Sequence, residues 1–301
     1  MTIREANNKL GAAQVAAGFA ALAALPALPV QYADYAVWQR EWLSGERLAE
    51  QVRYWREELK GAPQALALPT DRLRPAVQTY RGSTERVRLK REVWRGVKEL
   101  ALKEGATPFM VLMGAYQVLL SKYAGQEDVS VGTPIAGRRR EELEGLVGFF
   151  VNTLVVRGRL EGEPTFREHL SRVREAALGA FAHQDVPFEK LVEELQPTRD
   201  LSRSPLFQVL LVVQNAPLPE LTLPGLALRL FEAEGNITAK FELSLSLTDT
   251  AQGLAGSFEY NTDLFEPTTI ARMAGHLGVF LEGMVANPEQ RLSLLPLLSD
   301  A

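Results

Sequence analysis

The chain has 301 residues, 46% of them hydrophobic and 23% charged, which is the balance of a globular protein with a substantial core. A formal net charge of −4 and the lack of a basic stripe argue against a partner nucleic acid. The absence of cysteine excludes disulfides, thiolate catalysis and cysteine-based metal sites and fits a cytoplasmic location, while the three separated histidines make any metal site unexpected.

Residues 1–24 form an atypical N-terminal segment that precedes the main domain, which is expected over residues 25–301. The first part, residues 1–12, is polar and expected to be mobile. Gly11 to Val30 carry no charge and are rich in alanine. An alanine-rich helix ending at Pro26 is the favoured interpretation, and a poor secretory signal is the alternative. The run is too weakly hydrophobic to span a membrane.

A single long helix is predicted from Ala33 to Lys60. Aromatic and aliphatic side chains recur there mostly at three- and four-residue steps, which indicates one apolar face, and three of the four tryptophans lie on it. Gly61 followed by Pro63 marks its end. The segment from Pro69 to Gly82 is expected to be a loop.

Strands and helices are then expected to alternate. The predicted strands are Thr84–Leu89, Asp128–Thr133, Phe149–Leu160, Leu206–Val213, Leu226–Phe231, Phe241–Thr248 and Leu254–Tyr260. The predicted helices run from Glu92 to Lys103, from Pro108 to Gly125, from Thr165 to Phe181, from Phe188 to Leu195, and from Pro267 to before Pro288. The near-continuous apolar run Leu206–Val213 predicts a central strand buried on both faces. Together these patterns predict a mixed β-sheet packed with helices, of the α/β or α+β class.

Five polar or aromatic stretches stand out along this framework. They are Tyr32-Ala33-Asp34-Tyr35-Ala36-Val37-Trp38, Gly132-Thr133-Pro134-Ile135-Ala136-Gly137-Arg138, Gly148-Phe149-Phe150-Val151-Asn152-Thr153-Leu154, His183-Gln184-Asp185-Val186-Pro187-Phe188-Glu189, and Arg199-Asp200-Leu201-Ser202-Arg203-Ser204-Pro205-Leu206. In sequence, order and spacing they resemble the recurrent motifs of the condensation domains of non-ribosomal peptide synthetases. The resemblance covers the chain from about Leu25 to its C-terminus.

The resemblance implies a lobe of the chloramphenicol-acetyltransferase-like fold and an amide-forming acyltransferase reaction. Donor and acceptor substrates would arrive as thioesters on the phosphopantetheine arms of peptidyl or aminoacyl carrier domains. No cofactor would be bound directly, since phosphopantetheine belongs to the carrier partners. The family's catalytic histidine belongs to an H-H-x-x-x-D-G motif, which should lie upstream of Tyr32.

No pair of adjacent histidines occurs in this sequence. We therefore expect a C-terminal lobe with no catalytic residue of its own, weakly active or inactive when alone. The surface that meets a first lobe is expected to bind a separate first lobe or to self-associate. Two alternatives remain, a non-catalytic module that docks a carrier protein or synthetase, and a stand-alone acyltransferase.

The segment from His183 to Glu189 has two interpretations. His183 with Asp185 resembles a general base with an orienting carboxylate. In the structural interpretation, which we favour, His183 ends the preceding helix and Asp185 caps the helix beginning near Pro187.

Three further residues are candidates for a substrate tunnel or a lobe interface, namely Arg138, Asn152 and Ser204. Arg138 either pairs with the aspartate of the absent histidine motif, as the resemblance implies, or is an exposed charge beside Glu141 and Glu142. Asn152 either lines the tunnel, as the resemblance implies, or bridges to a neighbouring loop. Ser204 alternatively braces the loop before the central strand. Structural roles are expected for the remaining motif residues Tyr32, Asp34, Trp38, Gly148, His183, Asp185, Pro187, Arg199, Asp200 and Arg203.

Overall fold

The computed structural model describes residues 28–198, 200–214 and 238–296. These residues fall into two compact units. The small unit holds the described residues up to Ser44 together with Gly137–Phe150, and the large unit holds Gly45–Ala136 and the described residues from Val151 onward.

The small unit consists of helix α3 (Tyr32–Trp42) and a loop that contains the 3-10 turn η1 (Glu141–Leu143). Its core is formed by Leu143, Leu146 and Phe150, with Val30 and Tyr35 packed against them. No residue of α3 is itself buried. Helix α3 is therefore held by the contacts of a few partly exposed side chains and not by a buried apolar face.

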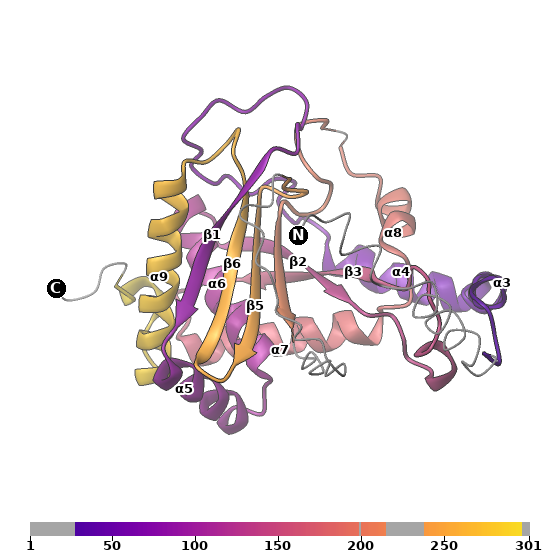
Figure 1. Ribbon diagram of the computed structural model, residues 1–301, viewed down its shortest axis with the longest axis horizontal. Coiled ribbons are helices and arrows are strands. Elements are labelled where there is room, and N and C mark those ends of the chain that lie inside the picture. Colours follow the sequence, from indigo (N-terminus) through magenta and orange to yellow (C-terminus); the bar gives the residue numbers. More distant parts are fainter. Residues whose placement is uncertain (1–27, 199, 215–237, 297–301) are drawn as a thin grey trace, which may run out of the picture. The chain divides into compact units, whose positions relative to one another are not determined.

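The large unit is built on a six-stranded mixed sheet with the order β1-β6-β5-β4-β2-β3 (Figure 1). The strands are β1 (Gly82–Leu89), β2 (Asp128–Ile135), β3 (Asn152–Arg159), β4 (Val209–Gln214), β5 (Leu243–Thr250) and β6 (Gly253–Asn261). The pairings of β4 with β2 and β5 are parallel, and the other three pairings are antiparallel. The predicted mixed sheet is confirmed.

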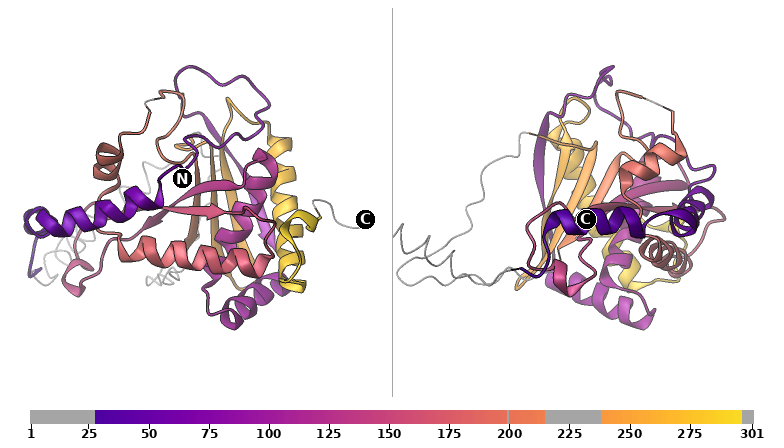
Figure 2. Two further views of the ribbon diagram at one scale, coloured as in Figure 1. Left: turned by 180° about the vertical axis from the view of Figure 1, so that it is seen from behind. Right: turned by 90° about the vertical axis from the view of Figure 1, so that its right-hand side faces the viewer.

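Most helices of the large unit pack on one face of this sheet, around the main hydrophobic core. The helices of the large unit are α4 (Gly45–Glu58), α5 (Arg91–Lys103), α6 (Pro108–Ala124), α7 (Phe166–Ala182), α8 (Phe188–Leu195) and α9 (Pro267–Ala286), and a 3-10 turn, η2 (Leu292–Leu294), follows. The reverse view in Figure 2 shows α6, α7 and α9 in front of the strands. Helix α6 lies deepest, since all residues from Met110 to Leu120 are buried. No described helix is long and apolar enough to cross a membrane.

Local signals fixed several helix ends correctly. Thr107 caps α6, with its Oγ1 accepting from the backbone N–H of Met110 at 3.3 Å, and Gly125 ends this helix in the left-handed conformation. A capping box forms at the predicted start of α7, because Thr165 and Glu168 bond to each other's backbone N–H.

The prediction of one helix from Ala33 to Lys60 is wrong. The chain forms α3 and α4 instead, and the break falls at Leu43-Ser44-Gly45. Ser44 Oγ donates to the carbonyl of Glu41 at 2.6 Å, and Gly45 adopts a φ of 57°. A serine hydroxyl that competes for helix carbonyls, followed by a glycine free to take positive φ, explains the break.

The predicted central strand Leu206–Val213 is confirmed in part, since β4 lies in the interior of the sheet, but it is shorter than predicted and not buried on both faces. The strand begins only at Val209, because Leu206 has a φ of 66° and the N–H of Phe207 bonds to Pro205. From Val209 to Val212 buried positions alternate with half-buried ones, because Val209 and Leu211 belong to the main core and Leu210 packs against a smaller cluster. The predicted strand Leu226–Phe231, the predicted helix within residues 1–24, and Arg199 lie outside the described residues.

Candidate functional site

The corner between α7 and α8 contains His183. This residue is the C-cap of α7, as predicted, and its ring Nδ1 donates to the carbonyl of Gly179 at 2.8 Å. The imidazole stacks on Tyr54 with ring centroids 3.9 Å apart and an angle of 5° between the planes. Trp55 Nε1 donates to the His183 carbonyl at 2.8 Å. The ring is thus held by one hydrogen bond and one stacked face.

Asn152, the first residue of β3, ties the same corner to the sheet. Its Nδ2 donates to the carbonyls of Gln184 and Val186 at 2.9 and 2.8 Å, and its Oδ1 accepts from the N–H of Phe188 at 2.9 Å. Asn152 therefore bridges to a neighbouring loop, and its amide satisfies the first free N–H of α8. The N-cap residue of α8 is Pro187 and not Asp185 as predicted, and the N–H of Phe188 bonds to Asn152 of β3.

In the small unit, the motif residues of α3 pack against the loop that ends at Phe150. Asp34 accepts from the N–H of Gln31 at 2.8 Å, and Tyr32 donates its hydroxyl to the carbonyl of Phe149 at 3.0 Å. The ring of Tyr32 lies where a β-carbon on Gly148 would be, so only glycine fits there. The rings of Trp38 and Trp42 stack, with their centroids 5.2 Å apart.

Arg138 lies in this unit with its guanidinium 4.1 Å from the centre of the Phe150 ring. It donates to the carbonyl of Leu143 and, at 3.4 Å, to that of Glu144. The guanidinium of Arg140 similarly lies 4.6 Å from the centre of the Trp38 ring. Arg138 is half-buried rather than simply exposed, and it fastens the 3-10 turn η1 to the aromatic cluster.

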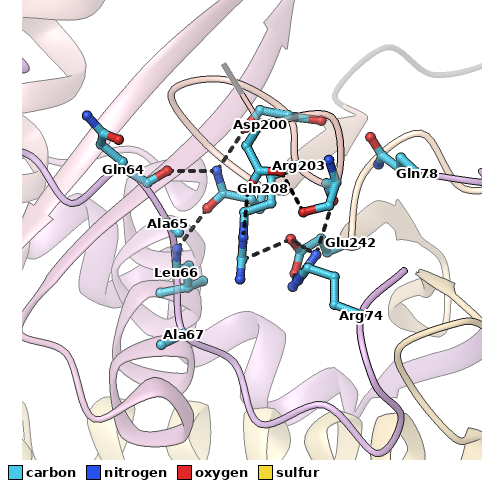
Figure 3. A network of polar contacts seen from close by, with 12 residues as sticks. Gln64, Ala65, Leu66, Ala67, Arg74, Gln78, Asp200, Arg203, Gln208 and Glu242 are labelled. Atoms are coloured by element: carbon cyan, nitrogen blue, oxygen red, sulfur yellow. Dashed lines mark hydrogen bonds and ion pairs between the residues drawn. The ribbon is translucent and has the colours of Figure 1, made fainter. Parts of the chain in front are cut away.

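A buried ion network lies beneath two loops of the large unit (Figure 3). Glu242 has only 2% of its side chain exposed, and Arg74 binds it through two contacts of 2.8 Å. Arg203 lies 3.4 Å from the same carboxylate, and it also forms an ion pair of 3.6 Å with the carboxylate of Asp200. Hydrogen bonds from Ser202 lower the pKa of the Asp200 carboxyl and so favour its ionised form.

Gln208 is the second buried polar residue beside the network. Its Nε2 donates to the carbonyls of Gln64 at 3.2 Å and Ser204 at 2.9 Å, and its Oε1 accepts from the N–H of Leu66 at 2.8 Å. Figure 3 shows Gln208 between these loops. One amide therefore joins the loop after α4 to the loop before β4, and it uses three of its hydrogen-bonding positions to do so.

A groove of about 1270 Å³ lies between these loops and the C-terminal ends of α4 and α8. Ser204, Asp200 and Arg203 line it, so the structure places these motif residues at one surface feature of the large unit. His183, Asp185 and Asn152 do not line it. Within the described residues, no cluster of histidine, aspartate and glutamate is arranged to hold a metal ion.

Sequence reasoning missed Glu242, Arg74 and Gln208. Glu242 gave no signal, because it falls on the polar face of the alternating predicted strand Phe241–Thr248. A usable signal was present for Gln208, which stands inside the otherwise apolar run Leu206–Val213. A charged or amide side chain at such a position must find buried partners. Arg74 gave no signal, since it lies in a loop with other arginines.

Comparison with known proteins places these features in a family. Residues 19–301 match the family model described as Condensation domain. One of the linear gramicidin synthase subunits of Brevibacillus parabrevis is 52% identical over 272 residues, which are 90% of this chain and 5% of that protein. Phosphinothricin tripeptide synthetase PhsC of Streptomyces viridochromogenes is 43% identical over 273 residues, which are 90% of this chain and 25% of that protein.

Solved structures agree with this assignment. The X-domain solved in a complex with OxyB from teicoplanin biosynthesis is 34% identical, with a TM-score of 0.82 over 92% of this chain and 62% of that chain. The four-domain nonribosomal peptide synthetase AB3403 is 29% identical, with a TM-score of 0.75 over 83% of this chain and 20% of that chain. The chain thus spans only part of each relative's length. It belongs to the condensation domain family of nonribosomal peptide synthesis.

Proposed function

We propose that this chain forms the second lobe of a condensation domain and makes amide bonds only when a first lobe supplies the histidine motif. The observation that carries the proposal is the family match over residues 19–301 in a sequence with no pair of adjacent histidines. The substrates are two thioesters held on the phosphopantetheine arms of carrier domains.

The positions of the three histidines support this dependence. His169 has no exposed surface, and burial lowers its pKa to about 4, so it is a neutral core residue. His276 Nδ1 lies 2.8 Å from the hydroxyl of Tyr123. His183 has its Nδ1 hydrogen bonded to a helix carbonyl and one ring face on Tyr54. Each histidine thus has a structural environment, which supports a substrate-facing base supplied by a first lobe.

The proposed reaction needs little covalent chemistry from this lobe. The acceptor amine attacks the donor thioester carbon, a C–N bond forms, and the C–S bond breaks. The phosphopantetheine thiolate leaves, and the proton lost by the amine neutralises it. The contribution of this lobe is to hold the two arms in line, which is the positioning component of catalysis.

The test is a condensation assay with two carrier proteins loaded with aminoacyl thioesters, read by mass spectrometry of the amide product. The chain alone should form product about 10²- to 10⁴-fold more slowly than the chain mixed with a first-lobe polypeptide from a relative. His183→Ala should leave the rate of the mixture unchanged. Full activity of the chain alone would overturn the proposed dependence, and loss of that activity in His183→Ala would identify His183 as the base.

A second candidate function is docking without turnover. The X-domain, 34% identical to this chain, was solved as a complex with OxyB, and this observation favours a protein-binding role as the alternative for this fold. Binding of a loaded carrier protein without amide product, even after addition of a first lobe, would favour docking over catalysis.

A further inference from the structure

The small unit has more large apolar side chains at its surface than in its core. Among its described residues, three apolar side chains are buried, whereas five large ones are exposed, namely Leu28, Tyr32, Val37, Val147 and Phe149. Val147 is 94% exposed and Phe149 is 73% exposed. Single apolar side chains at a surface are common, but a unit that exposes more of them than it buries gains little stability from its own packing.

Four of these exposed side chains belong to one surface. A β-carbon on Gly145 would lie 3.1 Å from Leu28 Cδ2, and a β-carbon on Gly148 would meet the ring of Tyr32. The chain between and directly after these two glycines carries the other two side chains. We call this surface the apolar patch, and it consists of Leu28, Tyr32, Val147 and Phe149.

The backbone beneath the apolar patch is fixed, although its side chains are exposed. Tyr32 donates its hydroxyl to the carbonyl of Phe149 at 3.0 Å, and its ring packs edge-on against Phe150 with the centroids 5.2 Å apart. Leu146 and Phe150, on either side of the exposed residues, are buried in the core of the unit. A partner that covers the patch would therefore order little additional backbone when it binds.

The occupant that fits the apolar patch is the first lobe of the same domain. This chain matches 62% of the solved X-domain chain, so the rest of that fold has no counterpart here. The family resemblance places the histidine motif upstream of Tyr32, and Tyr32 is itself part of the patch. A first lobe that precedes Tyr32 in sequence would reach the patch without a long linker, so its effective concentration there would be high.

We propose that the apolar patch of the small unit binds the first lobe through an apolar surface of that lobe. This inference rests on the proposed function, which requires a first lobe, and it adds the residues that hold the lobe. Binding removes Val147 and Phe149 from water, so these two side chains contribute most of the affinity. The lobe also supplies the buried contacts that the small unit lacks.

The test co-expresses this chain with the first-lobe polypeptide of the matched domain of the gramicidin synthase subunit that is 52% identical, so that the lobe can fold against the chain. The native chain should retain the lobe in a pull-down experiment. The double variant Val147→Ser, Phe149→Ser should weaken the affinity about 10- to 100-fold in biolayer interferometry.

The matched control is Leu73→Ser. Leu73 is 97% exposed and lies in the large unit, so its loss should change the affinity by less than about twofold. All three substituted side chains are exposed, so the variants should keep the native fold, and circular dichroism checks this.

The proposal is overturned if the native chain retains no first lobe, or if the double variant binds the lobe as tightly as the native chain. A dimer of the chain alone that the double variant dissociates would also overturn it, because a second copy would then cover the patch. Lobe binding that appears only after removal of residues 1–27 would do the same, because the chain's own first residues would then occupy the patch.

Amide formation is assayed separately on the co-expressed pair, so the two proposals fail separately. Lobe binding that survives the double substitution overturns the patch and leaves the dependence on a first lobe standing. Binding that needs the patch but yields no amide product overturns that dependence and leaves the patch standing.

Discussion

Glu242 illustrates how single buried residues position the surface of this domain. Its carboxylate is almost fully buried and is shared by Arg74 and Arg203, which belong to two different loops. The charge of Glu242 therefore reduces the repulsion between these two guanidinium groups, and Asp200 supplies a second anion beside Arg203. Its neighbour Gln208 adds three hydrogen bonds between the same parts of the chain.

Replacing Glu242 with glutamine should lower the free energy of unfolding by about 3 kcal/mol, because it removes the counter-charge of the partly buried Arg74 and leaves Arg203 paired with Asp200 alone. Urea denaturation measures this change. The control is Glu99→Gln, whose partner Arg95 lies 3.7 Å away with both side chains 72% exposed. That variant should lose less than about 0.5 kcal/mol. Equal losses in the two variants would contradict the importance of the buried network.

His169 should make the stability depend on pH. Burial lowers its pKa to about 4 in the folded protein, against about 6.5 in the unfolded chain. Between these values only the unfolded chain binds the proton, so the free energy of unfolding should fall, by on the order of 3 kcal/mol, as pH drops from about 6.5 to about 4. Above about pH 7 this contribution is constant. His169→Gln should flatten the profile in urea denaturation, and an unchanged profile would contradict the assignment.

At the scale of elements, the ends of helices are held by side chains that are distant in sequence. Asn152 of β3 satisfies the start of α8, and Arg157 of the same strand holds the end of α4. Arg157 donates to the carbonyls of Glu58 and Lys60 at 2.8 and 2.9 Å, and it forms a two-point ion pair with Asp128 at 2.6 and 2.9 Å. A cation at a helix C-terminus also complements the helix dipole.

Arg157→Met should therefore cost about 3–5 kcal/mol of unfolding free energy, since it removes the ion pair of Asp128 and the hydrogen bond to the Lys60 carbonyl in a site where Arg157 is 8% exposed. Arg159→Met is the matched control. Arg159 also bonds to Glu58 but is 40% exposed, so its loss should cost less than about 1 kcal/mol. Chemical denaturation measures the unfolding free energy of both variants. A smaller loss in Arg157→Met than in Arg159→Met would refute the stabilising role of Arg157 at the end of α4.

At the scale of the whole molecule, the two compact units differ in the size of their hydrophobic cores. The large unit has a continuous hydrophobic core in which α6 is buried along most of its length. The small unit has three buried core residues, and its helix α3 has none. Isolated helices as short as α3 are marginal in water.

Hydrogen exchange should show this difference. The backbone amides of α6 should be among the slowest to exchange, because they open only with the global core, and those of α3 should exchange much faster through local opening. Mass spectrometry of deuterium uptake at neutral pH measures both on one sample. If α3 were protected as strongly as α6, its few aromatic contacts would be stabilising it far more than their burial suggests.

The sequence by itself determined the order of elements, the mixed sheet, the caps at Thr107 and Thr165, and the family resemblance. Each of these rests on local periodicity, capping chemistry or motif spacing, which are properties of neighbouring residues. Only the tertiary structure decided that α3 and α4 are separate, that Asn152 binds the first N–H of α8, and that Glu242 joins Arg74 to Arg203. The last two outcomes depend on partners 36 to 168 residues away. A local pattern can require that a buried polar group find a partner, but only the folded chain selects which one.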